Sequence, residues 1–216
     1  KNKLLTTIAY KIGNQKMYCY EGSIFVAGSA IQWLRDKLQI IKDSKETDEL
    51  YAKADKNEKI VVVPALTGLG SPHWKPKVRG GIFGLTRNTS IQEIVKATLD
   101  SISFQTLDLV KAMEKDSKIR ILEMRVDGGM VNNNNFVQSL SDILQIKIIK
   151  PVDTETTALG AAYLASINAG LIKDTKTITN FWKSKKIYKP QKRVAVVNKE
   201  IKKWKKTLNF LIKYHS

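Results

Sequence analysis

Residues 121–133 read ILEMRVDGGMVNN, and this stretch decides the fold. Residues 121–126 are rich enough in apolar side chains to form a strand, and the glycines at 128 and 129 end it. The following residues, 133–144, carry apolar side chains at helical spacing. A strand that passes through a glycine turn into a helix is typical of an α/β protein, and the turn presents backbone N–H groups at the start of the helix.

The two glycines of this turn are the strongest local sign of a binding site. Glycine has no Cβ, so Gly128 and Gly129 let a flat or anionic ligand approach the backbone closely. The amide of Asn133 can then bond a base edge, and Asp127 can line the site. Each residue also has a structural explanation, because glycine suits tight turns, Asn suits helix starts, and Asp127 can bond the following turn. The local residues leave both interpretations open.

Alternating strands and helices extend on both sides of this turn. The pattern predicts strands at residues 4–10, 16–20, 60–63, 82–85, 121–126 and 146–149. It predicts helices at residues 24–41, 49–54, 91–113, 133–144 and 156–169. Ser90 and Glu93 form a capping box that opens the third of these helices. The alternation indicates the α/β class, with a mixed sheet flanked by helices.

A second candidate site lies on the helix predicted over residues 24–41. Gly28 and Gln32 are four residues apart, so a bare backbone patch lies beside an amide side chain on one helix face. Helix packing explains such a pair as well, and the local residues favour it. Residues 67–70 contain two glycines but lack the lysine and the spacing of a phosphate-binding P-loop.

No local arrangement of titratable residues identifies a catalytic base or a metal site. His73 has no second His or Cys near it, and Cys19 has no positioned His, so we expect Cys19 to be a core residue. Asp100 and Asp108 lie on a predicted amphipathic helix, where we expect them to be solvated or to cap.

The formal net charge of +17 raises the question of nucleic-acid or membrane binding. The excess is almost all Lys, dispersed along the chain, whereas specific readers of phosphate and guanine rely on Arg. We therefore expect no specific nucleic-acid partner. The densest lysine cluster, residues 183–213, is interpreted as a basic surface helix.

Cysteine usage and hydropathy indicate the cellular compartment in which the protein is expected. A single cysteine excludes an intrachain disulfide, and no apolar run reaches the roughly 18 residues of a membrane span. The N-terminus lacks a signal peptide, so we expect a cytoplasmic protein. The chain begins with Lys1 on a strand-like run, and we interpret it as a piece of a longer protein.

Seven ordered motifs resemble the C-terminal domain of the glycerol kinases, within the FGGY family of carbohydrate kinases. They read LLTTIA (4–9), EGSIFVAG (21–28), IQWLRD (31–36), VPALTGLGSP (63–72), RGGIFGLTR (79–87) with ATLD (97–100), RVDGG (125–129) and TALGAAYLA (157–165). The resemblance implies an actin-like, ribonuclease-H-like domain over residues 1–175, followed by a basic tail with a predicted helix over residues 176–216.

The resemblance also implies the chemistry. A domain of this kind closes over ATP against an N-terminal partner domain, and the parent enzyme phosphorylates glycerol to glycerol 3-phosphate. Gly28, Gln32, Gly129 and Asn133 fall on the family's contacts to ATP or ADP, which carries Mg²⁺. The family's catalytic aspartate, its glycerol contacts and its first phosphate-binding hairpin lie upstream of Lys1, so no catalytic or metal-binding residue carries over. We expect the isolated chain to be inactive.

Two alternatives stay open. The parent enzyme could be a kinase of another sugar or polyol of the same family, because the substrate-selecting residues are not in this sequence. The chain could also be a non-catalytic remnant of a split gene. The resemblance leaves open a homo-oligomer and gives no regulatory partner.

Overall fold

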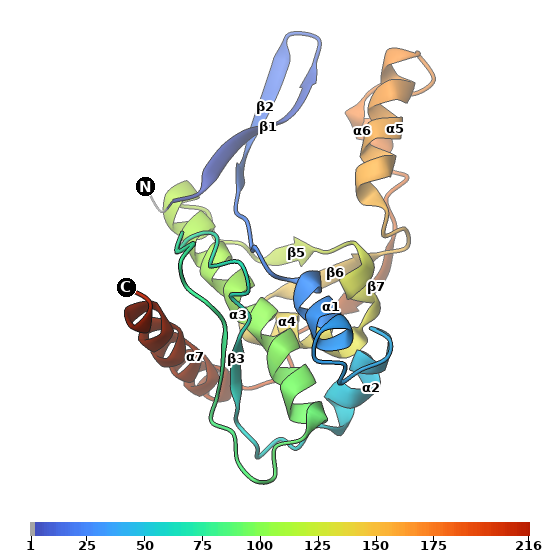
Figure 1. Ribbon diagram of the computed structural model, residues 1–216. Helices are drawn as coiled ribbons and strands as arrows, with labels where there is room; N and C mark the ends of the chain where they lie inside the picture. The colour runs from blue at the N-terminus through green and yellow to red at the C-terminus, as the bar shows by residue number, and fades with distance from the viewer. Residues whose placement is uncertain (1–2) are drawn as a thin grey trace.

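The computed structural model describes residues 3–216, whose strands and helices alternate as the sequence predicts (Figure 1). The strands are β1 (Leu5–Ile12), β2 (Gln15–Glu21), β3 (Val61–Val63), β4 (Gly81–Phe83), β5 (Glu123–Arg125), β6 (Lys147–Pro151) and β7 (Ser184–Tyr188). The helices are α1 (Gly28–Asp36), α2 (Glu46–Lys53), α3 (Ile91–Ser117), the short 3₁₀ turn η1 (Gly129–Asn132), α4 (Asn134–Leu144), α5 (Thr156–Asn168), α6 (Thr175–Thr179) and α7 (Val194–Tyr214).

A mixed three-stranded sheet carries the glycine turn. Its order is β5, β6, β7, with β5 parallel to β6 and β7 antiparallel to it. α4 follows β5 and returns the chain to β6, which is the strand, turn, helix and strand order that the sequence predicts. β3 and β4 form a separate antiparallel pair.

The hairpin of β1 and β2 projects away from this body (Figure 1). The chain turns at Gly13, whose φ of +55° favours glycine. Apolar side chains of the hairpin such as Ile8 and Tyr18 are exposed. The predicted hairpin is confirmed, but in this chain it lacks a core of its own.

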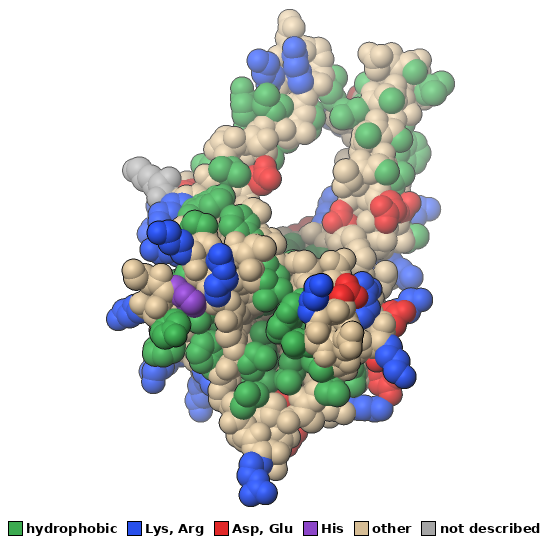
Figure 2. Space-filling view, in the orientation of Figure 1, with side chains coloured by type: hydrophobic (Ala, Val, Ile, Leu, Met, Phe, Trp, Pro, Cys, Tyr) green, Lys and Arg blue, Asp and Glu red, His purple; other side chains and the backbone are tan. Residues whose placement is uncertain are grey.

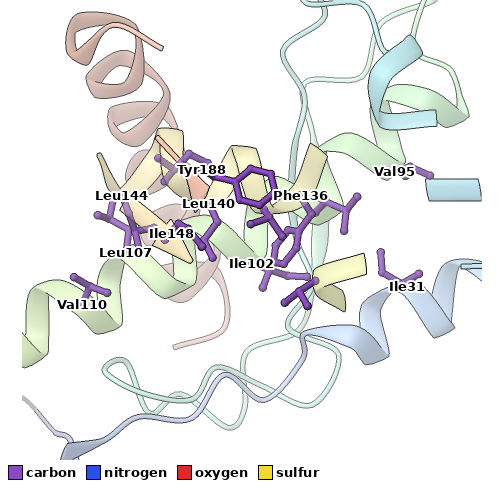
Figure 3. Close-up of a cluster of buried hydrophobic side chains, with 14 of the residues drawn as sticks. Ile31, Val95, Ile102, Leu107, Val110, Phe136, Leu140, Leu144, Ile148 and Tyr188 are labelled. Carbon is purple, nitrogen blue, oxygen red and sulfur yellow. The ribbon is translucent and has the colours of Figure 1, made fainter. Parts of the chain in front are cut away.

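The main core lies where α3 and α4 pack against each other and against β6 (Figure 3). Side chains from several elements meet there, and they include Ile31, Ile102, Phe136, Ile148 and Tyr188. The long α3 begins with the predicted capping box of Ser90 and Glu93. It ends at Lys118, which adopts a left-handed conformation.

Helix α1 is shorter than the predicted range of residues 24–41. It begins only at Gly28, because Ala27 has a φ of −117° and a ψ of −97°, which are not helical. Upstream, the N–H of Ser71 donates to the carbonyl of Ser23 at 2.9 Å and joins this segment to another. The helix ends early because Gln39 adopts a φ of +55°, a left-handed conformation that is incompatible with a continuing right-handed helix. The apolar spacing alone shows neither constraint.

The C-terminal segment contributes to the body of the molecule. β7 extends the mixed sheet, and α7 buries Trp204, Leu208 and Leu211 in a second core with β3. By contrast, α5 has no buried residue and stands apart beside the hairpin, with an opening between them (Figures 1 and 2). The division of the chain at residue 175 stays a prediction.

Within residues 3–216, no helix is both long enough and apolar enough to cross a membrane.

Candidate functional site

The glycine turn lies at the carboxyl end of β5, where parallel strands of α/β proteins present ligand sites. The N–H of Gly128 donates to the carbonyl of Thr154 at 3.2 Å, which joins the turn to the segment after β6. Gly128 has a φ of +80°, so the turn itself requires glycine there.

Gly129 differs from its neighbour in a way that bears on binding. Its φ lies outside the left-handed region, and no atom lies within 4 Å of the position that a Cβ would take. Neither the backbone conformation nor packing within residues 3–216 therefore requires glycine at this position. The residue opens onto free space at the start of η1.

The structure brings the first turn of α1 against this region. A Cβ on Gly28 would lie 3.6 Å from the Sδ of Met130, which is ordinary van der Waals contact. Gln32 follows one turn later on α1, exposed and without a hydrogen-bond partner among residues 3–216. Two separate segments that the sequence singled out are thus neighbours in space.

Asn133 is the N-cap of α4. Its Oδ1 accepts from the N–H of Phe136 at 2.7 Å, and its Nδ2 donates to the Oγ1 of the buried Thr47 at 3.0 Å. This is the structural role that the sequence left open, and a single side chain at a helix start can fill it while contacting a ligand. The backbone N–H and the Nδ2 of the neighbouring Asn135 both donate to the Oδ1 of Asp48, so α2 anchors the start of α4.

The sequence analysis did not single out Lys150, whose side chain bonds the backbone of the glycine turn. Its Nζ donates to the carbonyl of Val131 at 2.6 Å, and only 7% of the residue is exposed. Burial lowers the pKa of this lysine, and the nearby Lys185 and Lys186 lower it further. Lys150 lies two residues after the buried Ile148 on β6, and alternate residues of a strand share a face. This spacing was the signal in the sequence that could have indicated a buried lysine.

Asp127 lies beside a second feature of this sheet edge, a cavity. It accepts a hydrogen bond from the Oγ1 of Thr156, and it lines a cavity of about 460 Å³ between the ends of β5 and β6 and helix α5. On another wall of this cavity, the guanidinium of Arg125 stacks 4.1 Å above the ring of Trp182. Both interpretations of Asp127, as a site-lining group and as a bond to a turn, fit this placement.

Three expectations about isolated side chains are wrong. Asp100 is buried rather than solvated, and it accepts from Lys96, from the hydroxyl of Tyr51 and from that of Ser139. Asp108 faces His73, whose Nε2 lies 3.3 Å from its Oδ2. Cys19 is exposed on β2, because the hairpin that carries it has no covering layer.

The residues around the turn suit hydrogen bonding to a ligand. The glycine turn and the start of α1 provide backbone groups and amides, and the carboxylates near the turn are already engaged. Within residues 3–216, no group of three or more His, Cys, Asp or Glu side chains could hold a metal ion. The geometry suits a neutral, hydrogen-bonding wall.

Comparison with known proteins agrees with this geometry. The model of the C-terminal domain of the FGGY family of carbohydrate kinases matches residues 4–169. The chain is 44% identical over 214 residues to the glycerol kinase of Alkaliphilus metalliredigens, covering 99% of this chain and 43% of that protein. It is 47% identical over 205 residues to the glycerol kinase of Bacillus subtilis, covering 95% and 41%.

Solved structures show the same likeness. The crystal structure of Plasmodium falciparum glycerol kinase with ADP superimposes with a TM-score of 0.88 at 32% identity, over 96% of this chain and 42% of that one. The gluconate kinase of Lactobacillus acidophilus gives 0.83 at 22% identity, over 99% and 43%, which supports the fold alone. The chain spans about two fifths of the length of these relatives.

Proposed function

The chain belongs to the FGGY family of carbohydrate kinases, and from this membership we propose that it forms the nucleotide-binding wall of a glycerol kinase. Its fold is the actin-like, ribonuclease-H-like α/β domain of that family. The parent enzyme transfers the γ-phosphoryl group of ATP to glycerol, in a cleft that this chain closes against an N-terminal partner domain.

The observation that carries the proposal is the open face of Gly129. The residue is glycine although its backbone and packing would accept a side chain, so the free space beside it is the feature in need of a cause. An adenosine lying against this backbone supplies one. A glycerol kinase of 32% identity has been solved with ADP, which supports the same ligand here.

The other residues have assigned parts in this proposal. Gly28 and Gln32 extend the wall along the first turns of α1, and the exposed amide of Gln32 is free to bond the nucleotide. Asn133 offers its amide from the cap of α4. Lys150 acts through Val131 and holds the turn in place, so it is a positioning residue.

Mg²⁺ and the general base come from outside this wall. Phosphoryl transfer depends on positioning and charge stabilisation, and the ion supplies charge at the phosphates. The carboxylates around the glycine turn are held by Thr156 and by α4, which fits a wall that binds adenosine rather than metal. The catalytic base and the glycerol pocket belong to the partner domain.

Two rivals remain for the parent protein. A kinase of another sugar or polyol would have the same wall, and a substrate screen of the parent enzyme separates it from a glycerol kinase. A non-catalytic remnant would lack a partner half, and an upstream reading frame encoding that half would argue against it.

The test of the wall is a graded series at one position. In the enzyme reconstituted with its N-terminal half, Gly129→Ala should weaken ADP binding modestly and Gly129→Val severely, because the side chain grows into the ligand's space. Thermal melting should stay near that of the wild type, since no atom lies within 4 Å of the new Cβ. Cys19→Ser, on the hairpin, serves as a remote control.

Asn133 needs a variant that separates its two roles. Asn133→Ser keeps an N-cap oxygen and removes the amide, so ADP affinity should fall by about 1 kcal/mol, while stability should fall less than in Asn133→Ala, because only the bond to Thr47 is lost. Asn133→Ala should lower both affinity and stability. Unchanged ADP affinity in a well-folded Gly129→Val enzyme would show that the double glycine is only a turn, and the proposal would fall.

A further inference from the structure

A second cavity, of about 430 Å³, lies between residues 56–62, α3 and α7. None of its lining residues belongs to α1, η1 or α4, so it is separate from the nucleotide wall proposed above. Its volume falls within the range of small-molecule sites. No part of the proposed function accounts for it.

One wall of this cavity is aromatic and apolar. The rings of Phe104 and Trp204 stack with their centroids 5.3 Å apart and an interplanar angle of 13°. Ile60, Ala97 and Val196 extend this wall with aliphatic surface. Such a surface favours the flat or apolar body of a ligand.

The remainder of the lining is charged, and its cations exceed its anions. The lysines are Lys56, Lys59, Lys96, Lys199 and Lys203, and the carboxylates are Glu58, Glu93, Asp100 and Glu200. Two of these carboxylates are neutralised, Asp100 by Lys96 and Glu200 by Lys192 from outside the cavity. Four lysines then face two carboxylates, which already accept hydrogen bonds from Thr86 and from the capping box of α3.

Lys59 and Lys203 lie near each other on the cationic side of the cavity. The Nζ of Lys203 donates to the backbone carbonyl of Lys59, which carries no net charge. Burial lowers the pKa of Lys203, and the ammonium of Lys59 lowers it further. Lys56, Lys59 and Lys199 form no ion pair within residues 3–216. The cationic side of the cavity is therefore uncompensated.

We propose that this cavity binds a small amphiphilic anion, with its apolar body against Phe104 and Trp204 and its phosphate or carboxylate between Lys59 and Lys203. The anion neutralises the two lysines, and the stacked rings bury its body. The cavity lies between α3 and α7, so ligand binding also stabilises the packing of α7 on α3.

The probe for this site is 1-naphthyl phosphate, titrated calorimetrically into the 216-residue chain. Inorganic phosphate alone should bind much more weakly, because it lacks the apolar body, and neutral 1-naphthol should do so because it lacks the charge. Saturating ADP should not displace the probe. Displacement by ADP, or equal binding of 1-naphthol, would overturn the proposal.

Matched variants on the same elements locate the binding. Lys59→Gln and Lys203→Gln should each weaken the probe about tenfold, the effect of one charge-assisted hydrogen bond. Lys202→Gln changes the same charge on α7 outside the cavity and should leave binding unchanged.

A second pair tests the cavity by filling it. Val196 lines the cavity and is 46% exposed, so Val196→Trp can fill its mouth without disturbing a core. Val194→Trp places the same ring on the same helix turn outside the lining. The first variant should abolish binding and the second should not. Equal effects within either pair, or no binding of the probe at millimolar concentration, would refute the site.

Discussion

Asp100 is the residue at which burial and charge oppose each other most directly. Burial alone would raise the pKa of this carboxyl, but the Lys96 ammonium and the hydroxyls of Ser139 and Tyr51 outweigh burial and hold the pKa below its ordinary value. The pKa of Lys96 is raised in turn, because Asp100 outweighs its burial. The pair is stable only as an intact unit.

Asp100→Ala should therefore lower the free energy of unfolding by about 3 to 5 kcal/mol, since it leaves a half-buried ammonium without its partner. Asp100→Asn should cost less, because the amide still bonds its neighbours. Urea unfolding of the two variants and of Lys111→Gln, an exposed residue of the same helix, measures the difference. Equal stability of Asp100→Ala and the wild type would mean that the cluster contributes nothing.

The same residue predicts a pH dependence. A depressed folded pKa contributes stability above the unfolded value of about 3.9 that is lost as the pH falls through the folded pKa. The melting temperatures of wild type and Asp100→Asn should differ by a constant amount from roughly pH 5 to pH 7, above that pKa, and should converge below it. Lys96 does not affect this window, because its raised pKa matters only in alkali.

Residue-level sequence reasoning failed at Asp100 for a physical reason. α3 was expected to have one apolar face, but α2, α4 and β3 cover it on several sides. Polar residues such as Thr98 and Ser101 are buried there, and each bonds a carbonyl of its own helix. A helix that satisfies its own hydroxyls can be buried without an apolar pattern.

At the scale of elements, the hairpin of β1 and β2 is the least supported part of the fold. A two-stranded hairpin is marginally stable in water, and this one exposes Leu5, Ile8, Tyr18 and Tyr20. β5 is likewise an edge of its sheet, with Leu122 exposed just before it. The exposed apolar side chains of the hairpin and the edge position of β5 are typical of surfaces that contact another polypeptide.

In hydrogen exchange, the amides of β1 and β2 should exchange faster than those of α3. Adding the N-terminal half should slow exchange in the hairpin and in β5, while α7, whose core contacts are already complete, should change little. Exchange in the hairpin that is unaffected by the partner half would remove this expectation.

The sequence predicts most of the elements but not their ends. It misses α6 and also β7, a strand within the residues interpreted as a basic surface helix. The glycine turn, the hairpin and the capping box each depend on residues within a few positions, so local patterns suffice. The ends of α1 depend on the conformations of Ala27 and Gln39, and the exposure of α5 depends on which surface is present to cover its small side chains. The local sequence carries neither kind of information.

At the scale of the whole molecule, the proposed function assigns the nucleotide wall to this chain and assigns the base and the glycerol pocket to the partner domain. The purified chain should therefore consume no ATP in response to glycerol. A coupled assay of ADP release, with and without glycerol, measures this. Mixing with the N-terminal half should restore turnover, whereas glycerol-dependent turnover by the chain alone would contradict the division of roles.

The distribution of charge fits this assignment. Lysines and arginines are spread over the visible face of the molecule instead of forming one basic stripe (Figure 2). The sequence predicted that much from the dispersal of lysine. It could not predict the cluster of lysines around the cavity beside Trp204, because residues 56–62, α3 and α7 meet only in three dimensions.

The exposed hairpin also carries the protein's single cysteine, Cys19. A maleimide fluorophore will therefore label this chain at one site, on β2, without any engineered thiol. Because the hairpin stands clear of the body, the dye's anisotropy and its energy transfer to a second dye will report in real time when and how fast a partner closes over it. Cys19 therefore provides a natural labelling site for timing the assembly of the two proposed halves.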